Sequence, residues 1–339
     1  MKFCMVQPII NIRKNDMNFS RREALLASLA LFEGANTNVI AQQTPSYPIA
    51  PIRFIIPTAA GGGHDVMMRV IGQKLTERLG QPCVVESRSG ASGAIAAGVV
   101  AQAPADGYTL LLGYSAFLSN TVLVEKPTYK VEDFVPISML ALTPIVLGIS
   151  EILAASTIKQ YVAIAKTRPN EMSYASYGPG SGGHFVGELF NMAAGINTVH
   201  VPYKGETPAL MDVLSGQVQA SFTSVGGARR YPGRIRALAV ATKERSPSYP
   251  DVPTFAELGY PEVDMPGWGA LFASAKTPPA IIQLLSTEIN RIVMLPDVKT
   301  KMAELGFDAV GWNQDRTNIF LKEQLASTKK LVNSGRIKM

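Results

Sequence analysis

A glycine-rich turn that occurs twice is the feature that most limits how this chain of 339 residues can fold. Gly62-Gly63-His64 follows the apolar run 51–57, and Gly182-Gly183-His184 follows the strand-like run 172–176, 120 residues later. A helical pattern begins directly after each copy. A strand, a glycine turn and a helix start direct free backbone N–H groups, and the positive end of the helix dipole, at one point. Two such turns predict two lobes that close on one negatively charged ligand.

The order of the predicted elements indicates an α/β fold. Strand-like and helical patterns alternate along most of the chain, which predicts a mainly parallel sheet with helices on both faces. The apolar run 135–149 reads as one strand that passes from the first lobe to the second, and the return falls near residues 268–273. We therefore expect residues 45–143 and 268–339 to form the first lobe and residues 144–267 to form the second.

The N-terminus has the pattern of an export signal over residues 1–41. Met17 is a better start than Met1, because Ser20-Arg21-Arg22 then supplies a charged region ahead of the apolar run 24–32. That run is far shorter than the ~18 apolar residues of a membrane-spanning helix. Residues 39–41 provide the small residue expected at a cleavage site. We expect export to the periplasm by the Sec or the twin-arginine route, with a disordered cytoplasmic tail as the alternative.

Composition and motifs exclude several classes of function. The net charge is +6, the first 41 residues carry two of these charges, and no Lys/Arg cluster suggests a nucleic-acid partner. The three histidines are far apart, and no HExxH or CxxC spacing is present, so no metal site is expected. Walker A and GxSxG motifs are missing, and the SxxK at 156–159 lacks its usual partner motifs. The chain is therefore not expected to be an enzyme or to hold a cofactor.

One motif keeps a nucleotide-dependent alternative open. Residues 178–183 fit GxGxxG between a strand and a helix, the pattern of a dinucleotide-binding turn. The acidic residue expected near the end of the next strand does not occur in residues 200–204. A nucleotide-binding oxidoreductase is thus the second hypothesis, and a ligand sensor in signalling is the third.

Polar and aromatic side chains near the turns have two readings each. His64 and His184 start their helices and either donate to the ligand or serve as capping and packing residues. Asp65 adds negative charge to an anion site, so we expect it to hold the turn through backbone N–H groups. Tyr114, Phe117, Tyr177 and Trp268 stand at predicted strand ends that face the cleft.

With these residues placed, the sequence resembles the extracytoplasmic solute receptors of the tripartite tricarboxylate transporter family, also called the Bug family. The stretches that carry the resemblance are residues 47–53, 57–65, 77–82, 106–113, 133–137, 184–190, 199–205, 236–240 and 245–254. The resemblance implies a two-lobed, type II periplasmic binding protein fold, with two doubly wound sheets joined by two crossing segments. It also implies a monomer that binds a small carboxylate and docks on a large and a small membrane subunit.

In the family, both turns grip a ligand carboxylate through backbone N–H groups, small hydroxyls and water. By this resemblance we expect the ligand contacts to be Thr58, Ala59, Ala60, Gly61, Gly62, Gly63, His64, Asp65, Tyr114, Ser115, Ser176, Tyr177, Gly180, Ser181, Gly182, His184, Tyr203 and Thr223.

Departures from the family pattern suggest the character of the ligand. Family members usually read Phe-Asp-Asn where this chain has Phe222-Thr223-Ser224, so a carboxylate near the cleft is lost and an amino-acid ligand is less expected. Tyr114, Phe117 and Tyr177 replace small residues, and His64 stands where Thr is usual. Aromatic walls favour an aromatic or partly apolar carboxylate over citrate.

Overall fold

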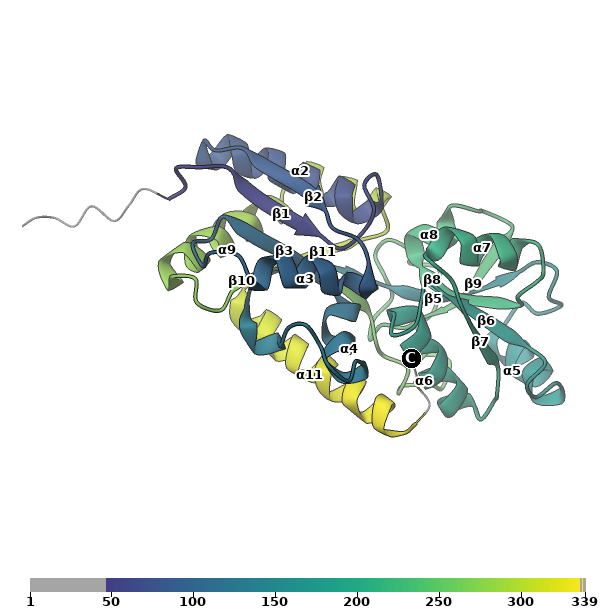
Figure 1. Ribbon diagram of the computed structural model, residues 1–339. Coiled ribbons are helices and arrows are strands. Elements are labelled where there is room, and N and C mark those ends of the chain that lie inside the picture. Colours follow the sequence, from purple (N-terminus) through teal and green to yellow (C-terminus); the bar gives the residue numbers. More distant parts are fainter. Residues whose placement is uncertain (1–46, 336, 338–339) are drawn as a thin grey trace, which may run out of the picture. The chain divides into compact units, whose positions relative to one another are not determined.

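The computed structural model describes residues 47–335 and residue 337 (Figure 1). The export signal predicted over residues 1–41 lies outside these described residues. Within the described part, no helix has both the length and the apolar character needed to cross a membrane.

The first sheet has six strands in the order β11-β4-β10-β3-β1-β2. Its strands are β1 (Ile52–Ile56), β2 (Cys83–Ser87), β3 (Thr109–Tyr114), β4 (Phe134–Thr143), β10 (Gly267–Ser274) and β11 (Asp308–Trp312). The helices that accompany it are α2 (Gly63–Leu79), α3 (Ala94–Ala101), α4 (Ser115–Leu123), α9 (Pro279–Val293), α10 (Pro296–Glu304) and α11 (Gln314–Asn333), with the short 3-10 turns η1 (Ala91–Gly93) and η2 (Val131–Asp133). α2 ends at Gly80, which adopts the left-handed conformation that favours glycine.

The second sheet has five strands in the order β7-β6-β8-β5-β9. They are β5 (Ile145–Ser150), β6 (Ser173–Ser176), β7 (Val199–Pro202), β8 (Ala220–Ser224) and β9 (Ile235–Val240). Its helices are α5 (Ile158–Thr167), α6 (Gly182–Ala194), α7 (Glu206–Leu214) and α8 (Val225–Arg229). In both sheets the glycine turn follows a parallel strand, β1 or β6, and leads into the next helix. The two turns therefore occupy equivalent places at the carboxyl ends of their sheets, where α/β folds bind ligands.

Each sheet is mixed, whereas the sequence predicted mainly parallel sheets. β1, β2 and β3 pair in parallel, but β10 is antiparallel to both β3 and β4. In the second sheet, β5 is antiparallel to β8 and β9. The reason is topological, because β4, β5 and β10 belong to the segments that connect the two sheets. They do not return through a helical crossover, which is what makes neighbouring strands parallel.

The crossing at residues 135–149 is two strands, not the one strand that we expected. Pro144 separates β4, in the first sheet, from β5, in the second. A proline has no backbone N–H for a ladder and so ends regular pairing. Its carbonyl oxygen accepts a hydrogen bond of 3.0 Å from the N–H of Val225. The two strands thus pair with different sheets on either side of one residue.

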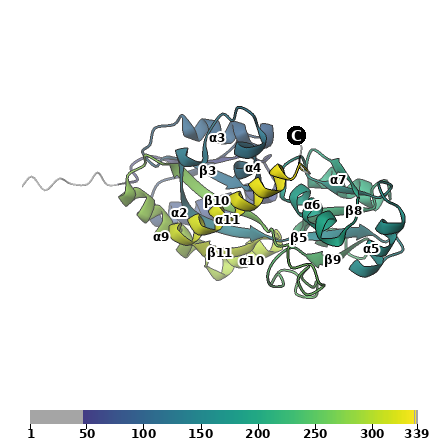
Figure 2. The ribbon, with the colours of Figure 1, turned by 90° about the horizontal axis from the view of Figure 1, so that it is seen from below.

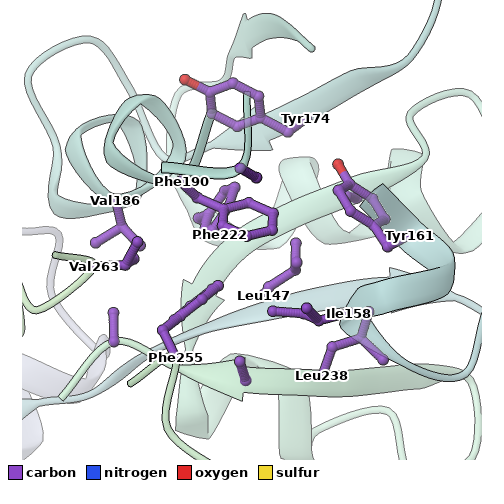
Figure 3. Packing of buried hydrophobic residues seen from close by; sticks show 14 of the residues in the cluster. Leu147, Ile158, Tyr161, Tyr174, Val186, Phe190, Phe222, Leu238, Phe255 and Val263 are labelled. Carbon is purple, nitrogen blue, oxygen red and sulfur yellow. The ribbon is translucent and has the colours of Figure 1, made fainter. Parts of the chain in front are cut away.

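A cluster of aromatic rings forms the core beneath the second glycine turn. Phe190 of α6 is 1% exposed, and its ring centroid lies 6.1 Å from that of Tyr161 and 5.0 Å from that of Phe255 (Figure 3). The ring of Tyr260 lies 5.3 Å from it. This packing holds α6, and with it the turn at its start, against the second sheet.

The end of the chain adds to the same core. α11 contacts β4 and α4 of the first sheet and also α6 (Figure 2). Leu331 near its end, and Ile337 beyond it, are buried in the hydrophobic cluster of the second sheet. The C-terminal segment thus packs on elements of both sheets.

Replacing Phe190 with Ala tests the importance of this core. We expect Phe190→Ala to lower the free energy of unfolding by ~3–5 kcal/mol, the usual cost of removing a buried Phe side chain. Urea unfolding of the purified protein measures the change. Met192→Ala on the same helix is the control, because Met192 is 43% exposed and its truncation removes little buried surface. Equal losses in the two variants would contradict this account of the core.

Candidate functional site

The first turn, residues 58–65, starts α2 with several donors unused. The N–H of Gly62 bonds to the carbonyl of Ala59 at 3.3 Å, and the N–H of Gly61 bonds to Asp65 Oδ2 at 2.9 Å. Gly62 is the N-cap and has no side chain to cap the helix. No hydrogen bond within the described chain uses the N–H groups of Gly63, His64 and Asp65. Because helix geometry provides these donors with no partner of their own, they are suited to an anion.

Three side-chain atoms of the first turn are also unpaired. Thr58 Oγ1, His64 Nε2 and Asp65 Oδ1 are buried and have no hydrogen-bond partner in the described part of the chain. A buried polar atom without a partner costs ~1–3 kcal/mol. The first turn therefore combines open backbone donors with polar side chains that gain from a bound ligand or water.

Asp65 holds the turn together, as the sequence predicted. Its Oδ2 accepts from the N–H of Gly61 and, at 3.0 Å, from Nε of Arg69 one turn along α2. The Arg69 guanidinium keeps the pKa of Asp65 below its usual value. The carboxylate is thus charged and tied to the loop and to a cation. Its negative charge is partly offset next to the open N–H groups.

His64 is neutral at pH 7. Its ring stacks on Phe307 with a centroid distance of 5.2 Å, and it lies 6.1 Å from the ring of Tyr114. Burial lowers its pKa to about 4. A neutral imidazole with a free Nε2 either donates or accepts one hydrogen bond. Phe307 comes from the segment before β11, and no motif in the sequence predicts its contact with His64.

The second turn, residues 176–184, differs because the chain satisfies its own donors. The N-cap Ser181 accepts from the N–H of His184, and the phenol oxygen of Tyr177 accepts from the N–H of Gly183 at 3.1 Å. His184 Nδ1 in turn accepts from the N–H of Gly180 at 3.2 Å. Two of the donors at the start of α6 are therefore already paired within the turn. The two glycine turns are alike in sequence but not in hydrogen bonding.

Close packing explains the glycines of the second turn. A Cβ at Gly183 would lie 2.3 Å from the carbonyl oxygen of Phe222, and one at Gly182 would lie 2.6 Å from Ile145. Both positions need glycine because the helix start presses on β5 and β8. Of the GxGxxG glycines in residues 178–183, Gly183 is thus required by contact between the helix and the sheet, and Gly178 and Gly180 by their positive φ angles of 134° and 67°.

His184 and His200 form a stacked pair behind the second turn. Their ring centroids are 3.8 Å apart and the planes are 10° from parallel, and His200 Nε2 is 2.7 Å from Ser176 Oγ. Burial lowers the pKa of His184 to about 4, and burial together with His184 lowers that of His200 to about 3. Both rings are neutral at pH 7. In this arrangement His184 and Ser176 support the turn from inside.

Helix α4, which follows β3 of the first sheet, contacts the second turn. Ser119 Oγ donates to the carbonyl of Gly180 at 2.9 Å, and Ser115 Oγ lies 3.7 Å from a Cβ placed on Gly182. Tyr114, the residue before α4, contacts the loop at Gly93, and burial raises its pKa to about 12. Tyr114 therefore lies near His64 of the first turn, and Ser115 lies near Gly182 of the second.

The two remaining expected contacts, Tyr203 and Thr223, both have their hydroxyl groups paired within the protein. Tyr203 turns its hydroxyl to Asp212 of α7 at 2.6 Å, and only its N–H meets the second turn, at the carbonyl of Ser176. Thr223 Oγ1 donates to Glu206 Oε1 at 2.6 Å, and the same oxygen accepts from the N–H of Ser224 at 2.6 Å.

Glu206 was not predicted as a site residue from the sequence, and its position corrects the expectation that the cleft lacks a carboxylate near Thr223. The replacement of an Asp by Thr223 was taken to remove a carboxylate from the cleft, but Glu206 supplies one at the same strand end. An acidic residue in the first turn of a helix is ordinary, because it stabilises the helix dipole. The sequence therefore gave no signal that this one reaches across to β8.

Two aromatic residues expected to face the cleft are in the core instead. Phe117, 4% exposed, stacks on Tyr129 and packs edge-on against Phe134. Trp268 is 2% exposed and belongs to the same cluster. The prediction for both was wrong. Trp268 shares with Ala270 and Phe272 the face of β10 that packs in this cluster, and a helix begins directly after β3 at Ser115. The turn of that helix directs Phe117 inward.

A cavity of about 560 Å³ opens beside the first turn. Its walls are Gly61, Gly62, Gly63 and Val66 on one side and Thr207, Gly226, Arg229, Arg230, Glu304 and Leu305 on the other. Arg229 donates to the carbonyl of Ser248, and Arg230 donates to Thr207 Oγ1. The first turn thus faces a space that two exposed guanidinium groups border. Within the described residues, no group of three or more His, Cys, Asp and Glu side chains is placed to hold a metal ion.

Two mixed sheets, with a glycine turn whose open N–H donors lie beside a cavity, are features of solute-binding proteins. A model of the "Tripartite tricarboxylate transporter family receptor" matches residues 67–336, and the chain belongs to this family. The protein BugT of Bordetella pertussis is 37% identical over 314 residues, which are 91% of this chain and 95% of that protein. This relationship confirms the family that the sequence motifs indicated.

Solved structures agree. "R. palustris Rpa4515 with adipate" matches with a TM-score of 0.79 and 31% identity over 86% of this chain and 99% of that one. "MatC (Rpa3494) from Rhodopseudomonas palustris with bound malate" matches with a TM-score of 0.73 and 28% identity over 84% of this chain and all of that one. The predicted periplasmic-binding-protein fold is thus confirmed. Because the family consists of receptors, the oxidoreductase hypothesis is set aside.

The three histidines, of which His184 is buried and His64 and His200 are partly buried, make stability fall with acid. Their folded pKa values of about 4, 4 and 3 lie below the ~6.5 of an unfolded histidine. Between pH 6.5 and 4 the unfolded chain binds protons that the folded chain does not. We therefore expect the free energy of unfolding to be full above pH 6.5 and to decline steadily as the pH falls toward 4.

Urea unfolding at a series of pH values checks this expectation. His200→Asn should flatten the decline between pH 6.5 and 4, where most carboxylates have not yet been protonated. A decline of the same slope in the variant would show that His200 is not buried in its neutral form.

Proposed function

We propose that this protein is a periplasmic receptor that binds a small carboxylate at the first turn and delivers it to a tripartite tricarboxylate-type transporter. The observation that carries the proposal is the set of unused N–H groups at Gly63, His64 and Asp65, together with the unpaired Thr58 Oγ1 and His64 Nε2. Such donors stabilise a carboxylate in water-poor surroundings through charge-assisted hydrogen bonds. The large and small membrane subunits of the transporter are the partners, and the receptor acts as a monomer.

A carboxylate fits better than other anions on two grounds. The described ligands of two solved relatives, adipate and malate, are both carboxylates. In addition, no lysine belongs to the first turn, so its donors are neutral apart from the helix dipole, and the charged Asp65 is close by. A singly charged group is accommodated more readily than a doubly charged phosphate in such a setting.

The rings around the first turn support an aromatic or partly apolar ligand. Tyr114, His64 and Phe307 lie side by side, and Tyr177 stands at the other turn. Phe117 no longer contributes, since it is in the core. Thr223 also does not count against an amino-acid ligand, because Glu206 provides a carboxylate at that strand end. The proposal of a partly apolar ligand therefore depends on the rings alone.

Export and closure complete the proposed function. Residues 1–41 serve as the leader, by the Sec or the twin-arginine route, and the two lobes are residues 45–143 with 268–339, and residues 144–267. Ligand closes the lobes through a hinge at the crossing segments. The burial of Leu331 and Ile337 in the second core means that the C-terminal segment must follow this motion or limit it.

A thermal-shift screen with carboxylates of different size and charge tests the ligand class. We expect stabilisation by aromatic or partly apolar monocarboxylates and less by citrate, because the rings beside the first turn favour apolar contact. Stabilisation by citrate or aspartate without any aromatic acid would contradict the proposed ligand character. Stabilisation by no carboxylate at all would contradict the function.

Replacing Thr58 with Val separates binding from stability. The change keeps the shape of the side chain and removes a buried hydroxyl that has no partner, so the free energy of unfolding should stay the same or rise. Loss of one hydrogen bond to a charged ligand should weaken the affinity for the best ligand of the screen by about tenfold or more. Isothermal titration calorimetry measures the affinity.

Thr317→Val is the matched control for Thr58→Val. Thr317 is fully buried, and its Oγ1 accepts from the N–H of Met139 and donates to the carbonyl of Asn313. Its loss should therefore lower stability and leave the affinity unchanged. Unchanged affinity in Thr58→Val would remove the first turn as the seat of the carboxylate.

A further inference from the structure

The two turns differ at two helix-start donors, and one of the two is paired by an aromatic side chain. In the first turn, the N–H of the second helical residue, His64, has no hydrogen-bond partner in the described chain. In the second turn, the equivalent N–H, that of Gly183, donates to the phenol oxygen of Tyr177 at 3.1 Å. A side chain of the protein thus occupies the position at which an anion would bind to α6.

Tyr177 fills this position closely. Its hydroxyl lies 2.9 Å from a Cβ placed on Gly182, and its ring lies 3.1 Å from a Cβ placed on Gly183. The phenol is therefore in contact with both glycines at the start of the helix. Burial, with a further contribution from Glu206, raises the pKa of Tyr177, so the group stays protonated and neutral. It shields the helix start without adding charge.

The surroundings of Tyr177 disfavour an anion. The Glu206 carboxylate is held at the end of β8 by Thr223 Oγ1 and by the N–H of Ser224, each at 2.6 Å. A ligand carboxylate in this part of the site would meet a carboxylate of the protein, and like charges at short range are costly. The first turn offers open donors to an anion, whereas the second offers a neutral hydroxyl beside a fixed negative charge.

We propose that Tyr177 is a specificity-determining residue that closes the second turn to anions, so that the receptor selects ligands with a single carboxylate. The inference rests on the proposed function, because it takes the first turn as the seat of that carboxylate. The rest of the ligand then meets the phenol hydroxyl, with a neutral or hydrogen-bonding group. Within the described chain, the second carboxylate of a dicarboxylate then meets only one open N–H at the start of α6, that of Gly182, whereas the start of α2 offers three.

Arg229 and Arg230 border the cavity beside the first turn, on a different wall from the second turn. They line the cavity beside the first turn together with Thr207 and Gly226, and no residue of the second turn lines that cavity. Both are exposed, so water screens their charge, and their main effect is to attract anions to the opening. A dicarboxylate that these two groups bound well would reverse the preference proposed here.

Matched pairs of acids test the proposal. Butyrate and succinate, hexanoate and adipate, and 4-methylbenzoate and terephthalate have the same carbon frame with one or two carboxylates. Calorimetric titration of the wild-type protein should give tighter binding of the monocarboxylate by about fivefold or more in each pair that binds. Tyr177→Ser frees the N–H of Gly183 and the space of the ring, and should shift the ratio toward the dicarboxylate by about tenfold, the effect of one charge-assisted hydrogen bond.

Two further variants separate the causes. Tyr177→Phe keeps the ring but removes the oxygen, so the position stays blocked and the monocarboxylate preference should persist. Tyr108→Ser is the control for the loss of a tyrosine, because Tyr108 packs on Tyr47 and precedes β3, at the opposite end of that strand from Tyr114. It should leave the ratio as in the wild type.

Each outcome decides the matter. A wild-type preference for dicarboxylates, or the same ratio in Tyr177→Ser as in the wild type, overturns the role of Tyr177 while leaving carboxylate binding intact. If neither member of any pair binds to the wild-type protein, the proposed function fails, and this inference fails with it. A shift in Tyr177→Phe as large as in Tyr177→Ser would place the effect on the hydroxyl alone and overturn the blocking role of the ring.

Discussion

The site depends on the fact that the first N–H groups of an α-helix have no partner within the helix. In the first turn these groups, at Gly63, His64 and Asp65, are left open, since the N-cap is a glycine without a side chain. Asp65 completes the arrangement by binding Gly61 and Arg69, which fixes the loop in the shape that exposes the donors. Everything else in the site positions or restricts access to these three groups.

The second turn shows how the same backbone geometry can serve another purpose. Ser181, Tyr177 and His184 pair three of its N–H groups, and the stacked rings of His184 and His200 fill the space behind. The aromatic core around Phe190 then holds α6 against the sheet. The turn is thereby a rigid wall, and its contribution to binding is made through side chains rather than through open amides.

Predictions from sequence failed where the outcome depended on residues distant in the chain. Phe117 and Trp268 were expected at the cleft and are in the core. A helix that starts immediately after β3 places Phe117 there, and Trp268 lies on the same buried face of β10 as Phe272. Glu206 and Phe307 reach the site from α7 and from the segment before β11, and neither lies in a recognisable motif. The mixed sheets were likewise hidden, because strand direction is set by how the crossing segments return and not by local pattern.

The sequence by itself determined the alternation of strands and helices, the two glycine turns and the family. These follow from local periodicity, from the conformational freedom of glycine and from the order of short motifs. Only the tertiary structure decided that the turns are unequal. Whether an N–H at a helix start is free or paired depends on which side chain reaches it. The phenol oxygen of Tyr177 accepts from the N–H of Gly183, while no hydrogen bond of the described chain uses the N–H of His64. Sequence specifies the donors, but packing decides which of them remain available to a ligand.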